Sequence, residues 1–240
     1  MGTKKKNRIE YIALLFMLMP FASCDDNATT DIIELPTAGS VATDNDGNTY
    51  EAGFQQASSI NQNPFVQKLD EDDHIIWQVI YEKSAVDGRA NLVNIDTQNR
   101  PWVVFSVDGG SNEDSYITKE AVKVDAFNNV FASGYGSGGG PKVSILARLD
   151  PASGEIEKAT FLTARLNNGK TNSLNIENIG FTDDHVLVQT KSAAWPPGEG
   201  TSYQRYPDIT DEDRIDNAFF VDYEISYDLN TISKATIRRE

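Results

Sequence analysis

The sequence contains few of the residues that build metal and catalytic centres. Its 240 residues include one cysteine and two histidines, which excludes an internal disulfide and a thiolate metal site. It also lacks any long stretch with a helical apolar stripe and caps at both ends. Short segments that alternate apolar and polar residues are abundant instead, cut by Asp, Asn, Gly and Pro. This pattern predicts an all-β protein.

Positive charge is scarce as well. The chain has 21 basic and 36 acidic residues, a formal net charge of −15. A surface this acidic repels phosphates, which argues against nucleic acid as a partner. Hydrophobic residues (39%) and aromatic residues (10%) are sufficient for a packed core, in one large domain or two small ones.

The N-terminus joins basic residues to an apolar run. Four basic residues within positions 4–8 precede residues 12–22, a run of 11 residues that is too short to span ~30 Å of hydrocarbon but suits a signal peptide. The letters FASC at residues 21–24 resemble the lipobox of bacterial lipoprotein signal peptides. That resemblance implies cleavage before Cys24 and lipidation of its thiol. An ordinary secretory signal with an accidental cysteine is the alternative.

The predicted organisation follows from this N-terminus. Residues 1–23 are the signal peptide, residues 24–40 are the lipidated Cys24 and a flexible polar tether, and residues 41–240 are the β-domain. Acyl chains on Cys24 anchor the protein to a membrane. For a body this acidic we expect the bacterial outer membrane or the cell surface.

Two kinds of segment alternate along the β-domain, and each kind is predicted to be a β-hairpin. The first kind spans residues 41–54, 92–106, 121–135 and 176–190. Its first three copies place an aromatic residue six positions after an Asp (Asp44, Asp96 and Asp125). The second kind spans residues 65–81, 145–161 and 221–237. It pairs an apolar residue with an Ile seven positions later, and both are expected to face inward: Leu69 and Ile76, Leu149 and Ile156, Ile225 and Ile232.

One hairpin of each kind provides the four strands of a propeller blade. Residues 124–162, which include VDAFNN, ASGY and ARLDPASGE, resemble the SBBP-type β-propeller repeat of bacterial surface proteins, and residues 41–81 match it more loosely. The resemblance implies consecutive antiparallel hairpins in a propeller-like array. The chain holds fewer hairpins than a full propeller of that family, so the predicted array is a small ring or an incomplete arc. A β-sandwich is the alternative.

Cofactor signals are weak. Asp44, Asp46 and Asn48 have the spacing of calcium ligands, but Thr49 and Gln55 occupy the Gly and Glu positions of an EF-hand loop. A plain hairpin tip explains the same residues, so we expect no cofactor, with Ca²⁺ as a weak alternative. The G-x-G-x-x-G at residues 134–139 is followed by a strand pattern, whereas a dinucleotide site needs a helix there.

Catalytic signals are equally weak. His74 and His185 each follow an acidic pair at a predicted hairpin tip, and adjacent carboxylates at a tip splay apart. We therefore expect a protein that is not an enzyme. The alternative is an enzyme or accessory of polysaccharide degradation that uses loop carboxylates.

Residues 192–217 form the longest predicted loop, and loops of this length are often functional. Trp195, Tyr203 and Tyr206 offer flat aromatic faces, and Arg205 and Asp208 offer hydrogen bonds. We expect these five residues to bind a glycan or a protein partner. The alternative is that the aromatic residues fold back as a lid over the core. The predicted function is therefore a membrane-anchored surface lipoprotein with a non-catalytic binding domain.

Overall fold

A computed structural model describes residues 35–59, 61–81, 88–109, 121–128 and 138–239, which belong to the compact unit Asp31–Glu240. The predicted signal peptide, Cys24 and the first part of the tether lie outside the described residues. The described residues contain strands and short 3-10 turns such as η3 (Asp211–Asp213), and no α-helix. They include no helix long and apolar enough to cross a membrane. The all-β prediction is confirmed.

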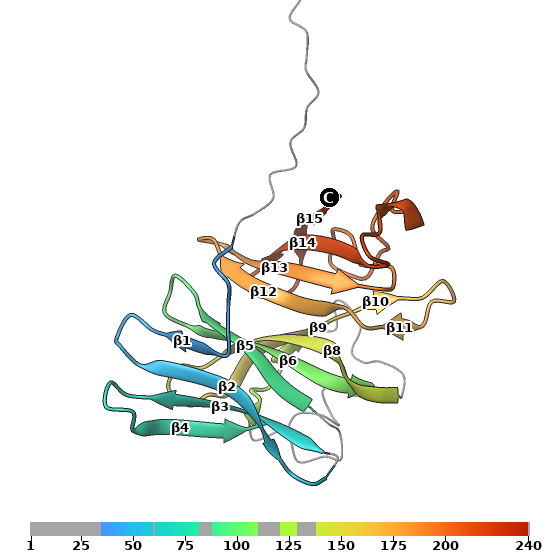
Figure 1. Cartoon of the computed structure of the whole chain (residues 1–240). Helices are drawn as coiled ribbons and strands as arrows, with labels where there is room; N and C mark the ends of the chain where they lie inside the picture. The colour runs from blue at the N-terminus through green and yellow to red at the C-terminus, as the bar shows by residue number, and fades with distance from the viewer. Residues whose placement is uncertain (1–34, 60, 82–87, 110–120, 129–137, 240) are drawn as a thin grey trace, which may run out of the picture. The chain divides into compact units, whose positions relative to one another are not determined.

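Three sheets, each built on four successive antiparallel strands, make up most of the structure (Figure 1). The first sheet has the order β1 (Val41–Thr43), β2 (Thr49–Gln56), β3 (Gln62–Leu69), β4 (Ile75–Ile80). The middle sheet has the order β5 (Gly88–Ile95), β6 (Pro101–Gly109), β8 (Gly138–Leu149), β9 (Ile156–Leu162), β7 (Phe127–Asn128). The last sheet has the order β12 (Asn175–Phe181), β13 (His185–Ser192), β14 (Phe219–Ser226), β15 (Ile232–Ile237). A small fourth sheet pairs β10 (Ala164–Arg165) with β11 (Thr171–Asn172).

The three second-kind hairpins share the same irregularity in their strand pairing. The register shifts by one residue immediately after the turn in β3–β4, in β8–β9 and in β14–β15. The apolar pairs at this point are Leu69 with Ile75, Leu149 with Ile156, and Ile225 with Ile232. A β-bulge at the same place in three sheets indicates one repeated structural unit.

The repeat register predicted from the sequence is correct for two copies and wrong for the first. Leu149, Ile156, Ile225 and Ile232 are all buried, as expected. Ile76, however, is 52% exposed, and Ile75, which pairs with Leu69 in its place, is 57% exposed. The turn between β3 and β4 is one residue shorter than its equivalents, so Ile76 becomes the bulged residue.

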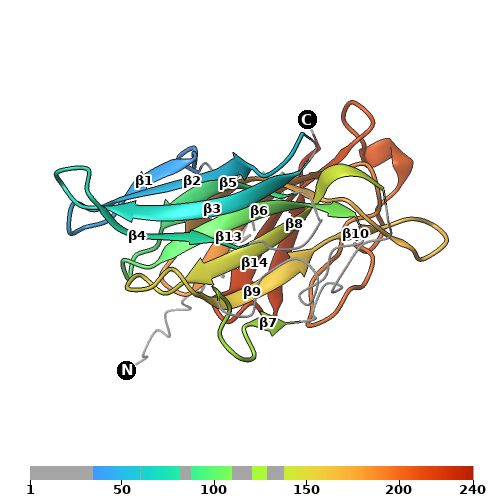
Figure 2. The same cartoon turned by 90° about the horizontal axis from the view of Figure 1, so that it is seen from below.

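The described part of the segment 121–135, residues 121–128, pairs with β9 rather than with a hairpin partner of its own. Its residues Phe127 and Asn128 run parallel to β9 and pair with Ala159 and Thr160, so this segment covers the outer edge of β9 (Figure 2). Lys123 fixes it there, because its Nζ lies 2.7 Å from Asp150 Oδ2 and 2.8 Å from Glu157 Oε1. The predicted returning strand at residues 129–135 lies outside the described residues.

Two hydrophobic clusters separate the three sheets. Val103 and Phe105 of β6 belong to the cluster shared with the first sheet, and Trp102 and Val104 belong to the cluster shared with the last sheet. The middle sheet is therefore buried on both faces, which explains the uninterrupted apolar run in β6. Three large sheets with two cores differ from the two-sheet β-sandwich that the sequence left open.

An aspartate organises several hairpin tips. Asp44, Asp70 and Asp96 each accept hydrogen bonds from the backbone N–H groups two and four residues later, at 2.8–3.0 Å. Asp96 also accepts a 2.9 Å hydrogen bond from Trp102 Nε1. The Asp that recurs six residues before an aromatic thus shapes the turn, as Asp commonly does. Asp125 is not equivalent, since it is exposed and has a φ of 60°.

The end of the predicted tether is attached to the domain. The backbone N–H of Ala38 donates to Asn178 Oδ1 at 2.8 Å, and Asn178 Nδ2 donates to the Pro36 carbonyl at 3.2 Å. Gly39 forms an antiparallel bridge with Val93 of β5. Residues 36–39 therefore join the last sheet to the middle sheet, and the expectation of a flexible tether as far as residue 40 is wrong for these residues.

Candidate functional site

The long loop 192–217 connects β13 to β14 and is held by its own backbone pairing. Trp195 bridges to Arg165, Pro197 to Arg205, and Gly200 to Ile232 of β15. Thr210 caps η3, where its side chain and that of Asp213 bond each other's backbone N–H groups. The loop is thus a built structure that rests on β10 and β15.

Trp195 lies beneath this loop as part of the core. It is 8% exposed, and its ring centroid lies 5.0 Å from that of Phe219. The Arg205 guanidinium lies 3.4 Å from its ring centroid, in a cation–π contact. The expectation that Trp195 presents a free aromatic face is wrong, and the lid-like alternative describes it correctly. Burial against Phe219 removes the large apolar surface of the Trp195 ring from water, which stabilises the fold more than an exposed position on the loop would.

Tyr203 is likewise turned inward. Its hydroxyl donates to the Trp195 carbonyl at 2.8 Å, and the Arg165 guanidinium lies 4.3 Å from its ring centroid. Burial raises the pKa of Tyr203, against the opposing effect of Arg165 and Arg205. This tyrosine therefore holds the loop together as a neutral hydrogen-bond donor.

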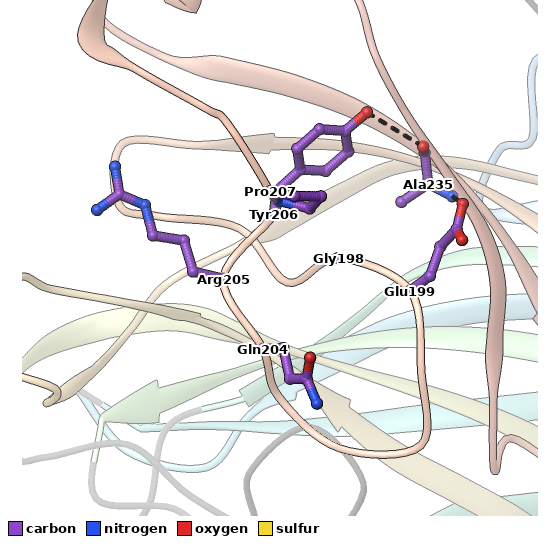
Figure 3. Close-up of a pocket in the computed structure, with 7 residues that line it drawn as sticks. All are labelled: Gly198, Glu199, Gln204, Arg205, Tyr206, Pro207 and Ala235. Carbon is purple, nitrogen blue, oxygen red and sulfur yellow. Dashed lines mark hydrogen bonds between the residues drawn. The ribbon is translucent and has the colours of Figure 1, made fainter.

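The loop leaves a shallow pocket of about 240 Å³ beside β15 (Figure 3). The pocket is lined by Gly198, Glu199, Gln204, Arg205, Tyr206, Pro207 and Ala235. The Tyr206 hydroxyl donates to the Ala235 carbonyl at 3.3 Å, and the Ala235 N–H donates to Glu199 Oε1 at 3.3 Å. The volume is below that of a drug-sized ligand site, so it fits a single small group such as one sugar ring.

The structure brings together two of the five loop residues predicted to bind a ligand. Arg205 and Tyr206 line the pocket, whereas Trp195 and Tyr203 are packed beneath or beside it. Asp208 is exposed, has a φ of 56° and does not line the pocket. Glu199 and Gln204 are pocket residues that the sequence did not single out, because isolated polar residues in a loop carry no pattern.

The weak calcium candidate is occupied by protein groups. Asp44 Oδ1 and Oδ2 accept from Asn48 Nδ2 at 3.1 and 2.9 Å, and Lys68 Nζ lies 3.3 Å from Asp44 Oδ2. Asp46 Oδ2 accepts from Asn99 at 3.1 Å. The Lys68 ammonium forms an ion pair with Asp44. The described part of the chain holds no cluster of three or more His, Cys, Asp or Glu side chains suited to a metal.

His185 has partners that the sequence did not indicate. Its Nδ1 lies 2.8 Å from Asp184 Oδ1, and its Nε2 lies 3.0 Å from Ser233 Oγ on β15. The hydrogen bond from His185 lowers the pKa of Asp184. His185 lies at its predicted hairpin tip, but its side chain is only 23% exposed. The order carboxylate, imidazole, hydroxyl is that of a nucleophilic triad. Ser233 lies 48 residues away in sequence, so only the pairing of β13, β14 and β15 brings it near.

His74 fits the expected tip. Its Nδ1 lies 3.3 Å from Asp70 Oδ2, and its side chain is 78% exposed.

No protein-family model matches the chain, and no curated protein matches its sequence.

Proposed function

We propose that the chain is a membrane-anchored surface lipoprotein whose β-domain binds a glycan or protein partner without chemical turnover. The observation that carries the binding proposal is the pocket on the loop 192–217. Its carboxylate, amide and tyrosine side chains are positioned by an ordered loop, which is the arrangement of a preformed site for a small polar group.

The proposal includes a propeller-like arrangement of the β-domain. Three successive sheets share one strand plan and one bulge, and residues 121–128 and 192–217 are insertions into that plan. These features support consecutive blades of an incomplete propeller. A propeller-like scaffold presents loops at the ends of its strands for binding.

Binding is tested with a glycan array and with partner capture by the full chain. Gln204→Ala removes an exposed pocket side chain, and its matched control Thr201→Ala changes an exposed residue of the same loop outside the pocket. We expect Gln204→Ala to weaken binding by roughly tenfold and Thr201→Ala to leave it unchanged. Equal affinities for the two variants would place the site elsewhere.

Anchoring is tested separately with Cys24→Ser. This variant should lose lipid labelling and leave the membrane fraction. A serine variant that still sediments with membranes at the same processed size would contradict the lipoprotein proposal.

A second candidate function is hydrolysis, and the Asp184, His185 and Ser233 chain favours it. Nucleophilic catalysis also needs an oxyanion site beside the hydroxyl, and the pockets beside β15 and around Asp213 are lined by other residues. We therefore rank it second. Ester hydrolysis that disappears in Ser233→Ala but persists in Ser202→Ala would favour hydrolysis over binding as the function.

A further inference from the structure

The last strand of the four-strand plan in each sheet, β4, β9 or β15, has an equivalent residue at its centre. Gln78 of β4 pairs with Gln67, Ala159 of β9 pairs with Ala147, and Ala235 of β15 pairs with Tyr223, each one pair beyond the residue that follows the bulge. The backbone of this residue faces the free edge of its sheet. An uncovered edge offers unpaired N–H and C=O groups to another strand.

The middle and last sheets cover this edge with their own insertions. The Ala159 N–H donates to the Ala126 carbonyl at 2.8 Å. The Ala235 N–H donates to Glu199, and its carbonyl accepts from Tyr206 (Figure 3). Both strands also carry charge, with Glu157 and Lys158 in β9 and Lys234 in β15. The insertions at residues 121–128 and 192–217 therefore both cover the outer edge of a strand, β9 in one case and β15 in the other.

The first sheet has neither form of protection in the part of the chain that the structure describes. No strand or loop there pairs with β4 on the side away from β3. The sequence of β4 is IIWQVI, without charge or proline. Ile75, Ile76 and Ile80 are 57%, 52% and 37% exposed. Native proteins seldom leave an apolar edge strand without a partner.

The direction of the free groups follows from one hydrogen bond. The Tyr81 N–H donates to the Pro64 carbonyl at 3.1 Å, so Tyr81 faces β3. Backbone groups alternate along a strand, which directs those of Gln78 and Ile80 outward. The outward N–H of Ala159, the equivalent of Gln78, confirms the direction.

We propose that β4 pairs antiparallel with β4 of a second copy of this chain, about a two-fold axis at Val79. This register places Gln78 of each copy opposite Ile80 of the other, so both outward residues of both strands are paired. It also keeps the side chains of opposed residues on one face, as a continuous sheet requires. The strand is self-complementary, which a two-fold interface demands. Each copy has a net charge of −15, but β4 itself is uncharged, so the pairing of two β4 strands places no like charges opposite each other.

The test uses the full chain in a Cys24→Ser background, so that the native thiol cannot form disulfides with the cysteines introduced below. Sedimentation should show a concentration-dependent dimer, since a six-residue pairing buries little area. Ile80→Lys should raise the dimer dissociation constant at least tenfold, because it sets two charges at the two-fold contact. Gln67→Lys adds the same charge to the same face of β3, one strand inside the edge, and should leave the dimer intact.

Two further measurements make the proposal falsifiable. Oxidation of a mixture of Gln78→Cys and Ile80→Cys proteins should give more disulfide-linked dimer than either protein alone. Hydrogen exchange should show the Gln78 and Ile80 amides protected in the dimer and unprotected in Ile80→Lys. A monomer at all concentrations, a dimer unaffected by Ile80→Lys, or protection of Gln78 in a monomer, which would mean that the chain covers its own edge, overturns the proposal.

Discussion

The middle sheet and the first sheet follow the same four-strand plan but differ in what surrounds them. The middle sheet has a hydrophobic cluster on each face, whereas the first sheet contributes to one cluster only. Five of the seven large hydrophobic residues exposed among the described residues belong to the first sheet: Val41, Phe54, Ile75, Ile76 and Ile80. Position in the stack, rather than the strand plan, thus determines which residues a sheet must bury.

The largest expected effect comes from the middle sheet. Trp102 is fully buried, and its ring lies 5.9 Å from Phe181 and 5.7 Å from Tyr227. Trp102→Ala should lower the free energy of unfolding by about 3–5 kcal/mol, as for other large core aromatics. Denaturant titration measures this loss. Trp77→Ala in the first sheet is the comparison, and an equal loss there would contradict the difference between the sheets.

A hairpin-tip aspartate of the middle sheet should show the next largest effect. Asp96 is 3% exposed and accepts from Trp102 Nε1, from Arg100 Nε at 2.7 Å and from two backbone N–H groups. Asp96→Ala leaves these buried donors without an acceptor, at a cost of about 2–3 kcal/mol. Asp70→Ala removes a tip side chain of the first sheet that accepts from the two equivalent backbone N–H groups but is 40% exposed, and thermal unfolding should show a clearly smaller change in Tm.

The attachment of residues 121–128 to the middle sheet predicts a pH dependence. The hydrogen bond from Lys123 lowers the pKa of Asp150 below its usual value. A carboxyl whose folded pKa is depressed stabilises the fold above its unfolded pKa and loses that contribution as the pH falls through the folded value. Asp150→Asn should therefore lower stability at pH 6, by up to about 1 kcal/mol for a part-exposed pair. The difference between the two proteins should shrink as the pH falls below the unfolded pKa of the carboxyl, and a constant difference from pH 2 to pH 6 would contradict the assigned cause.

The sequence predicted the strand class and the alternation of two hairpins, because period-two patterns and turn residues are local signals. It misplaced Ile76 because one residue fewer in a turn shifts the register. It misjudged residues 121–128 because an Asp followed by an aromatic residue imitates a hairpin, while the pairing of these residues with β9 joins segments distant in sequence. The length of residues 192–217 identified them as a loop, but the burial of Trp195 depends on Phe219 and Arg205, which only the folded loop brings together.

The smallest expected effect belongs to the open side of the first sheet. Phe54 is 45% exposed and contacts the Arg89 guanidinium 5.2 Å from its ring centroid, a cation–π interaction that contributes about 0.5–1 kcal/mol at an exposed site. Phe54→Ala should therefore cost about 1 kcal/mol or less. Phe105→Ala is the matched change in the middle sheet, since Phe105 is fully buried and lies 5.0 Å from Tyr81. Calorimetry of the two variants at equal protein concentration tests the comparison directly. A loss for Phe54→Ala as large as that for Phe105→Ala would mean that the first sheet is covered as completely as the middle one.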